Sequence, residues 1–238
     1  MTALRIRYAI VGLVILAAAA AIYWQYERGR PCAEPITYTI ASIDPRFGVS
    51  TSSVLAAAAQ AATIWNNAAG KTLLEYSPQG ELPISLVYDS RQALAKLGQE
   101  IAQKEAETDQ QRLAIDAERP SVTGENAAAF NAQVALFNAS VAALNQEISS
   151  YNQQAGGTFK EGEYDRDSSG ERIFIYEFIG TTQLERVLAH EFGHAIGLGH
   201  NTNPASIMYA ENESGNLVPT ADDLAALKAV CGSEISAQ

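Results

Sequence analysis

The segment HEFGHAIGLGH, residues 190 to 200, contains all three histidines of this 238-residue chain. Apolar residues recur at helical spacing just before it, which predicts a helix through His190 and His194. A step of four residues places both imidazoles on one face of that helix, where they can bind the same metal ion. On a continuous helix His200 would lie about 15 Å further along the axis, so the chain must turn back. Gly197 is placed to make this turn, because glycine accepts the left-handed conformation that ends a helix.

Three imidazoles suit zinc, and three protein ligands leave the fourth position of a tetrahedral ion open for water, as in catalytic sites. Zinc lowers the pKa of such a water to about 7. Glu191 is adjacent to the ligand His190, and it is placed to take the proton of the water and pass it to a leaving amine. The three histidines could instead be ordinary core residues, but their concentration in one short segment argues against this. The sequence therefore predicts one catalytic zinc.

The motif HExxHxxGxxH, with Ser206-Ile207-Met208-Tyr209 after it, resembles the signature of the metzincin zinc peptidases and their Met-turn. A tyrosine directly after the methionine is similar to the matrixin branch, that of the matrix metalloproteases. The segment LVPTADDLAALKAVCG, residues 217 to 232, resembles the C-terminal matrixin helix. The resemblance implies that Met208 lies beneath the metal as a hydrophobic base. It also implies an α+β fold with a mixed twisted sheet, an active-site helix and a C-terminal helix.

A matrixin-like domain over residues 29–238 would bind an extended polypeptide substrate along an edge strand, here within residues 158–165. The histidines used by the motif leave none for the second, structural zinc site of matrixins, so we expect one zinc ion. Two functions fit this pattern. The first is a zinc endopeptidase in which a zinc-activated water attacks the peptide bond with Glu191 as general base. The second is an inactive metzincin-fold interaction protein that works through a coiled-coil arm, the helical hairpin predicted for residues 91–155, although an intact Glu191 argues against it.

The chain before the motif predicts the alternation of strands and helices that such a domain needs. Residues 36–40 (ITYTI) are β-branched and alternate, which is typical of a strand. A helix is expected from a cap within residues 50–53 to Gly70, followed by strands in residues 71–77 and 82–88. Nearer the motif, TFKEGEYD (158–165) and RIFIYEF (172–178) predict two strands across a turn at residues 166–171.

Residues 91–155 depart from the matrixin pattern and predict an inserted helical hairpin, with a break at Pro120 to Gly124. Apolar residues of the second arm follow steps of four and three, which is typical of a coiled-coil seam: Phe130, Val134, Phe137, Val141, Leu144, Ile148 and Tyr151. The first arm starts in the same way but loses its phase at Lys104 and Thr108. The hairpin could gate the cleft or recruit a protein partner, or it could merely seal its own seam.

The turn after the first of these late strands contains Asp165, Asp167, Ser169 and Gly170, which begins like a calcium-binding loop. Tyr176 stands at the twelfth position, where a calcium loop needs a bidentate glutamate. A polar hairpin turn is therefore the main expectation, and a calcium ion is the alternative.

Residues 1–28 predict a signal anchor, because the chain is apolar and uncharged from Tyr8 to Trp24 and follows two arginines. The domain would then be tethered to a membrane by a single pass and lie outside the cytoplasm, in the periplasm or the extracellular space. Cleavage of this segment as a signal peptide, giving a secreted protein, is the alternative. Cys32 and Cys231 could form one disulfide in such an oxidising compartment, or remain two free thiols.

The charge balance argues against nucleic acid as a partner. The chain has 16 lysines and arginines against 27 acidic residues, a formal net charge of -11, with no basic cluster. Binding to a phosphate backbone depends on clustered basic side chains.

Overall fold

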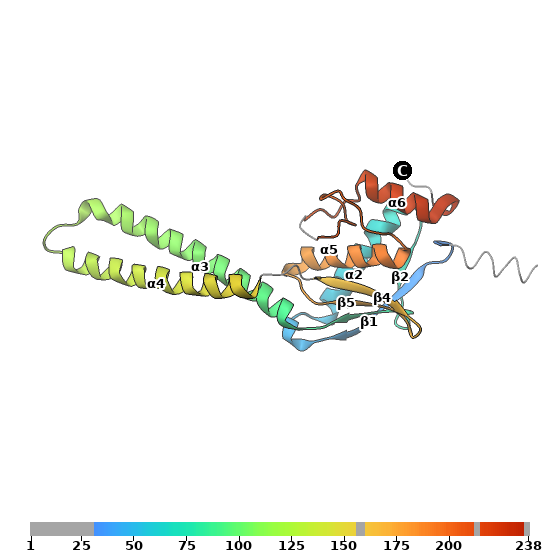
Figure 1. Ribbon diagram of the computed structural model, residues 1–238, viewed down its shortest axis with the longest axis horizontal. Coiled ribbons are helices and arrows are strands. Elements are labelled where there is room, and N and C mark those ends of the chain that lie inside the picture. The colour runs from blue at the N-terminus through green and yellow to red at the C-terminus, as the bar shows by residue number, and fades with distance from the viewer. Residues whose placement is uncertain (1–30, 156–159, 212–214, 236–238) are drawn as a thin grey trace, which may run out of the picture. The chain divides into compact units, whose positions relative to one another are not determined.

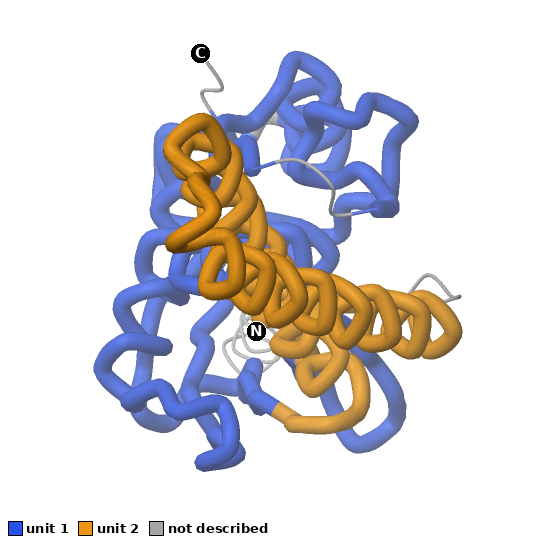
Figure 2. The backbone as a smooth tube through the Cα atoms, turned by 90° about the vertical axis from the view of Figure 1, so that its left-hand side faces the viewer, with its two compact units in different colours: residues 1–86, 162–175, 180–238 blue, residues 87–161, 176–179 orange. Residues whose placement is uncertain are grey.

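The computed structural model describes residues 31–155, 160–211 and 215–235, so the predicted membrane helix within residues 1–28 lies outside it. The described chain forms two compact units, coloured separately in Figure 2. One unit comprises the described residues up to Leu86 together with 162–175 and those from Gly180 on. The other comprises residues 87–161 and 176–179. Each unit is described separately below.

The first unit is built on a five-stranded mixed sheet in the order β2-β1-β3-β5-β4 (Figure 1). Four strands are parallel, namely β1 (Ile36–Ile43), β2 (Leu74–Tyr76), β3 (Leu82–Leu86) and β5 (Gly170–Ile175). The edge strand β4 (Gly162–Asp167) pairs antiparallel with β5. A mixed sheet combined with helices agrees with the α+β fold expected of a matrixin-like domain.

β2 and β3 lie parallel to β1 on its opposite sides and do not pair with each other. One sequence expectation for the strands needs correction. The turn between β4 and β5 is tighter than expected, since the ladder continues to the pair Asp167 and Gly170. Glycine fits there because Gly170 has a φ of 126°.

Helix α2 (Thr51–Ala69) starts and ends where its sequence predicts. The Ser50 hydroxyl accepts a hydrogen bond from the Ser53 amide, and Gly70 ends the helix with a left-handed φ of 68°. Its buried face is rich in alanine, which allows a close approach to α5 (Gly180–Ile196). The Trp65 indole N–H donates to the Ala189 carbonyl at 2.7 Å. These two helices therefore form one packed layer over the sheet (Figure 1).

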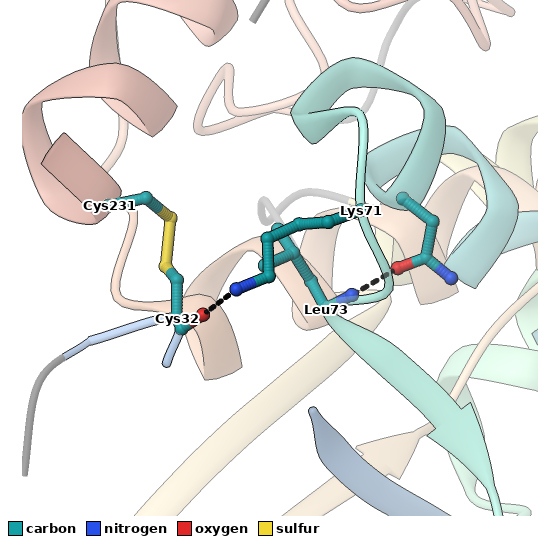
Figure 3. The surroundings of a disulfide bond; sticks show 5 residues. Cys32, Lys71, Leu73 and Cys231 are labelled. Atoms are coloured by element: carbon teal, nitrogen blue, oxygen red, sulfur yellow. Dashed lines mark hydrogen bonds between the residues drawn. A yellow bond between two sulfur atoms is a disulfide. The ribbon is translucent and has the colours of Figure 1, made fainter. Parts of the chain in front are cut away.

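Helix α6 (Ala221–Cys231) follows a capping box in which the Thr220 hydroxyl and the Asp223 carboxylate bond each other's backbone amides. At its end Cys231 forms a disulfide with Cys32, with the Cα atoms 5.3 Å apart (Figure 3). Beside this bond, the Lys71 ammonium donates to the Cys32 carbonyl at 2.7 Å. The disulfide thus joins the start of the described domain to its last helix.

The second unit is a helical hairpin of α3 (Ser90–Glu118) and α4 (Ala127–Gln154), connected through a short 3-10 turn at Arg119–Ser121. On α4, every residue of the expected seam is at least partly buried, and Phe130 and Leu144 are the most buried. Nearly all other residues of α4 are exposed. The sequence prediction of a helical hairpin with a 3.5-residue seam agrees with this burial. Knobs-into-holes coiled-coil packing stays a prediction.

The first arm of the hairpin does not lose its phase as the sequence suggested. Ile101, Thr108 and Ile115 follow one another at intervals of seven, and all three are at least partly buried. The second row of this seam changes from the apolar Leu97 to the polar Lys104, which pairs with Glu147 of α4 at 2.5 Å. One apolar row and cross-helix polar contacts are therefore enough to keep α3 on α4.

The base of the hairpin holds residues 176–179, which connect β5 to α5 in the chain. The Gln92 side chain is buried and makes two hydrogen bonds to the Phe178 backbone, at 2.9 and 3.0 Å. The Arg91 guanidinium lies 3.4 Å from the centroid of the Tyr176 ring and pairs with Asp89 at 2.5 Å.

Among the described helices, only α4 is long and apolar enough to cross a membrane. The apolar seam that α4 packs against α3 also explains this composition.

Candidate metal centre and active site

Helix α5 carries His190 and His194 one turn apart and ends at Ile196. Gly197 follows with a φ of 108°, and its amide donates to the carbonyls of Gly193 and His194. The Leu198 amide also donates to Gly193, which closes the helix end. The chain reverses here and brings His200 back to the two helical histidines.

The three imidazoles converge on one point. Their Nε2 atoms form a triangle with sides of 3.1, 3.1 and 3.2 Å. The corresponding edge of a tetrahedron with zinc–nitrogen distances of 2.0–2.1 Å is about 3.3 Å. The donor set therefore fits a zinc ion, and His190, His194 and His200 are the residues that would hold it.

The remaining ring nitrogens fix the orientation of the two helical ligands. His190 Nδ1 lies 2.7 Å from the Ile207 carbonyl, and His194 Nδ1 lies 2.9 Å from the Leu198 carbonyl. Because a carbonyl only accepts, each Nδ1 carries the proton and each Nε2 offers its lone pair. Burial, more than the neighbouring cationic groups, lowers the pKa of His190 to about 4. His190 is therefore neutral near pH 7, as a metal ligand must be.

Glu191 lies on the same helix and is 4% exposed. Its Oε2 accepts a hydrogen bond of 2.7 Å from the backbone amide of Tyr164 on the edge strand β4. The carboxylate is thus held between the helix that carries the histidines and the strand expected to bind substrate.

Met208 is fully buried against the middle of the motif. A Cβ atom on Gly193 would lie only 2.2 Å from the Met208 sulfur and 3.2 Å from the Trp65 ring. The glycine inside HEFGH is therefore required by packing, because a side chain there would displace the methionine. This contact places the Met-turn directly against the helix between His190 and His194.

The backbone of the Met-turn is held from two sides by buried groups of opposite charge. On one side, the Arg186 guanidinium donates to the carbonyls of Ser206 and Ile207 at 2.6 and 2.7 Å. On the other, the Asp223 carboxylate accepts from the amides of Ile207 and Met208 at 3.0 and 3.1 Å, and from the Ser206 hydroxyl. The Ile207 carbonyl that receives Arg186 also orients His190, so this clamp acts on one of the three histidines that could hold a metal.

These features agree with the comparisons to known proteins. The sequence matches the family Matrixin over residues 31–232, which is most of the chain. This chain belongs to the matrixin family. It is also 42% identical over 50 residues to the interstitial collagenase of Bos taurus. That stretch covers 21% of this chain and 11% of the collagenase, so the chain matches only a small part of that relative.

Sequence reasoning about this matrixin missed three parts of the site: the role of Arg186, the role of Asp223, and the contact of Tyr164 with Glu191. A signal existed for the first, since Arg186 precedes His190 by four residues and so shares its helix face. For Asp223 the Thr220 cap three residues earlier was a signal. No sequence signal indicated the backbone amide of Tyr164.

The proposed calcium turn of this matrixin is already occupied by an ion pair. The Arg172 guanidinium pairs with both Asp165 and Asp167, at 2.5 Å in the case of Asp167. Asp167 also accepts hydrogen bonds from Ser169, and its pKa is held well below the usual range, first by Arg172. A calcium ion at these carboxylates stays a prediction that would have to displace Arg172.

Proposed function

We propose that this matrixin is a zinc-dependent endopeptidase in which Glu191 is the general base. The observation that carries the proposal is the convergence of three Nε2 atoms, with the buried Glu191 directly after His190 on the same helix. An ion held there would act as a Lewis acid on the peptide carbonyl and increase the acidity of water. Glu191 would take a proton from the attacking water and deliver it to the nitrogen of the breaking C–N bond.

The edge position of β4 supports a polypeptide as the substrate. β4 is the last strand of the sheet, and its outer side has no strand partner within the described residues. An extended substrate could add to this edge through backbone hydrogen bonds, with its scissile bond near Glu191. Backbone recognition of this kind requires an extended, accessible segment of the substrate and leaves the choice of side chains open.

We further propose that the enzyme acts outside the cytoplasm, tethered by the apolar segment from Tyr8 to Trp24. The disulfide between Cys32 and Cys231 supports this location, since such bonds persist in oxidising compartments. After carbonate washing of membranes, a tethered protein stays in the pellet. Recovery of the mature chain in the soluble fraction, shortened at its N-terminus, would indicate cleavage and secretion instead.

The activity is tested with the full chain, purified in a mild detergent and loaded with zinc. Cleavage of an unfolded protein substrate is compared between the natural chain, Glu191→Ala and Glu185→Ala. Glu185 is a matched control, because it lies on the same helix outside the metal site. We expect cleavage by the natural chain and by Glu185→Ala, and a loss of at least about 100-fold in Glu191→Ala. Zinc binding without cleavage in all three proteins would instead support an inactive interaction protein.

A further inference from the structure

The edge strand β4 contacts the carboxylate of Glu191 with two consecutive outward-facing positions. In the antiparallel ladder with β5, the Glu161 carbonyl accepts a hydrogen bond from the Tyr176 amide. The backbone N–H and C=O groups of the odd-numbered residues from 161 to 167 therefore point toward β5. The even-numbered Gly162 and Tyr164 therefore turn their backbone groups to the outer side. Glu191 lies on that side and accepts the Tyr164 amide at 2.7 Å.

Gly162 fits against Glu191 only because it lacks a side chain. A Cβ atom at this position would lie 2.7 Å from Oε1 of Glu191 and 2.8 Å from Cγ1 of Val187. Its φ lies outside the left-handed region, so the backbone conformation is one that any residue adopts. The glycine is therefore explained by the space that the carboxylate needs, and not by the shape of the strand.

Both carboxylate oxygens of Glu191 thus lie against β4. Oε2 receives a hydrogen bond from the Tyr164 amide, while Oε1 occupies the space left by Gly162. A buried carboxylate retains several rotamers unless packing and hydrogen bonds select one, and proton transfer requires a carboxylate held at hydrogen-bond distance from its target. Neither residue binds the metal, and neither exchanges a proton.

We propose that Gly162 and Tyr164 are positioning residues for the general base: the bare Cα of Gly162 and the outward amide of Tyr164 hold the Glu191 carboxylate in its working orientation. This inference rests on the proposed peptidase function. It adds that the edge strand has a role in the chemical step itself as well as in substrate binding. It also implies that the Tyr164 amide is engaged by Glu191, so the next outward amide available to a substrate is that of Arg166.

Variants of the full chain separate these two roles of β4. Gly162→Ala pushes a methyl group against Glu191. Tyr164→Pro removes the amide that Glu191 accepts, without removing a ladder hydrogen bond, because proline is tolerated at outward edge positions. Tyr164→Ala keeps the amide and controls for loss of the phenol. Arg166→Pro removes the next outward amide on the same strand and is the matched control for the proline.

For each variant we would measure bound zinc, the midpoint of thermal unfolding, kcat and KM. We expect Gly162→Ala and Tyr164→Pro to keep one zinc and a cooperative unfolding transition while kcat falls about 10- to 100-fold, with a smaller change in KM. Arg166→Pro should act mainly through KM, and Tyr164→Ala should retain a higher kcat than Tyr164→Pro. Combined with Glu191→Ala, the Gly162→Ala change should cause no further loss, because its effect acts through that carboxylate.

The inference is overturned if folded, zinc-loaded Gly162→Ala and Tyr164→Pro retain the natural kcat. It is also overturned if the losses in Gly162→Ala and Glu191→Ala multiply. Should Gly162→Ala fail to fold, Tyr164→Pro against Arg166→Pro decides the question by the same kcat criterion. A natural chain that binds zinc but cuts nothing would refute the proposed function, and the inference with it. A Gly162→Ala or Tyr164→Pro variant that cuts as fast as the natural chain would refute the inference alone.

Discussion

Asp223 is a single buried carboxylate that joins three parts of the site. It caps α6, accepts two amides of the Met-turn, and bonds the Ser206 hydroxyl. Burial alone would raise its pKa, but the hydrogen bonds from Ser206, Thr220 and Ile207 outweigh burial and lower it. The carboxylate is therefore stabilised in its charged form and holds the turn that orients His190.

We expect Asp223→Asn to destabilise the protein at pH 7 by about 1–3 kcal/mol, because an amide group presents a donor where several donors already point. A carboxyl whose pKa is lowered by folding contributes stability above its unfolded value, near 3.8, and loses it as the pH falls through its folded value. The difference between the natural chain and the variant should therefore shrink in acid. Urea unfolding at several pH values measures it.

The neighbouring Asp222→Asn is the control, because Asp222 is exposed and bonds only the Asn203 amide among the interactions described for it. Equal stability losses in both variants would contradict the role given to Asp223.

At this scale the sequence was sufficient to single out the three histidines that the structure brings together, along with Glu191, Gly197 and Met208, since their spacing is a local pattern. It was insufficient for Arg186, Asp223 and Gly162, whose roles depend on partners distant in the chain.

At the scale of elements, the hairpin base contains a carboxyl group with a strongly shifted pKa. Burial, followed by the nearby charge of Glu161, raises the pKa of Glu177 to about 7, although Arg91 acts in the opposite direction. A carboxyl whose pKa is raised by folding contributes stability that is complete below its unfolded value of 4.5 and is lost as the pH rises to about 7. The hairpin base should therefore weaken as the pH rises from about 4.5 to about 7.

Replacement of this carboxyl tests that expectation. Glu177→Gln should match the natural chain in stability near pH 4 and exceed it by about 1–2 kcal/mol at pH 8, a figure reduced for solvent screening. Thermal unfolding followed across this range, with exposed Glu125→Gln as the control, gives the comparison. A stability difference that is the same at pH 4 and pH 8 would show that ionisation of Glu177 is not the cause.

Removal of the helical arm tests whether the metal centre is independent of it. We would delete residues 95–153 and close the gap with a short glycine-serine linker, retaining Gln92 because it bonds the Phe178 backbone. All three histidines and the Met-turn belong to the other unit, so we expect one bound zinc and altered substrate choice. Metal analysis and a panel of unfolded substrates measure both. Loss of zinc would mean that the hairpin is part of the catalytic fold.

The elements also indicate why sequence patterns succeed or fail. The α4 seam was predictable, because apolar residues fill both of its heptad positions. The continuation of the seam on α3 was not, since Thr108 and Lys104 are polar, and their place depends on the facing helix. The pairing of the strands could not be predicted either. β2 and β3 both pair with β1, but nothing in their residues indicates this partner.

At the scale of the whole molecule, the disulfide closes a loop over most of the described chain, with its two cysteines 199 positions apart in the sequence. We expect Cys231→Ser to lower the free energy of unfolding by about 2–5 kcal/mol, mainly because the unfolded chain regains freedom. Cys32→Ser should cause the same loss, and the double variant no more than either single one. Urea unfolding midpoints test this, and additive losses would indicate that each cysteine stabilises the fold separately from the bond.

The central claim is that one metal ion, held by His190, His194 and His200, is required for peptide-bond cleavage by this matrixin. The most direct measurement adds zinc stepwise to the chelator-stripped full chain and follows the rate of cleavage of an unfolded protein. We expect no cleavage without metal and a rate that rises linearly and levels off at one zinc per chain. Cleavage that persists in the stripped protein, or that stays absent at one bound zinc, would contradict the claim.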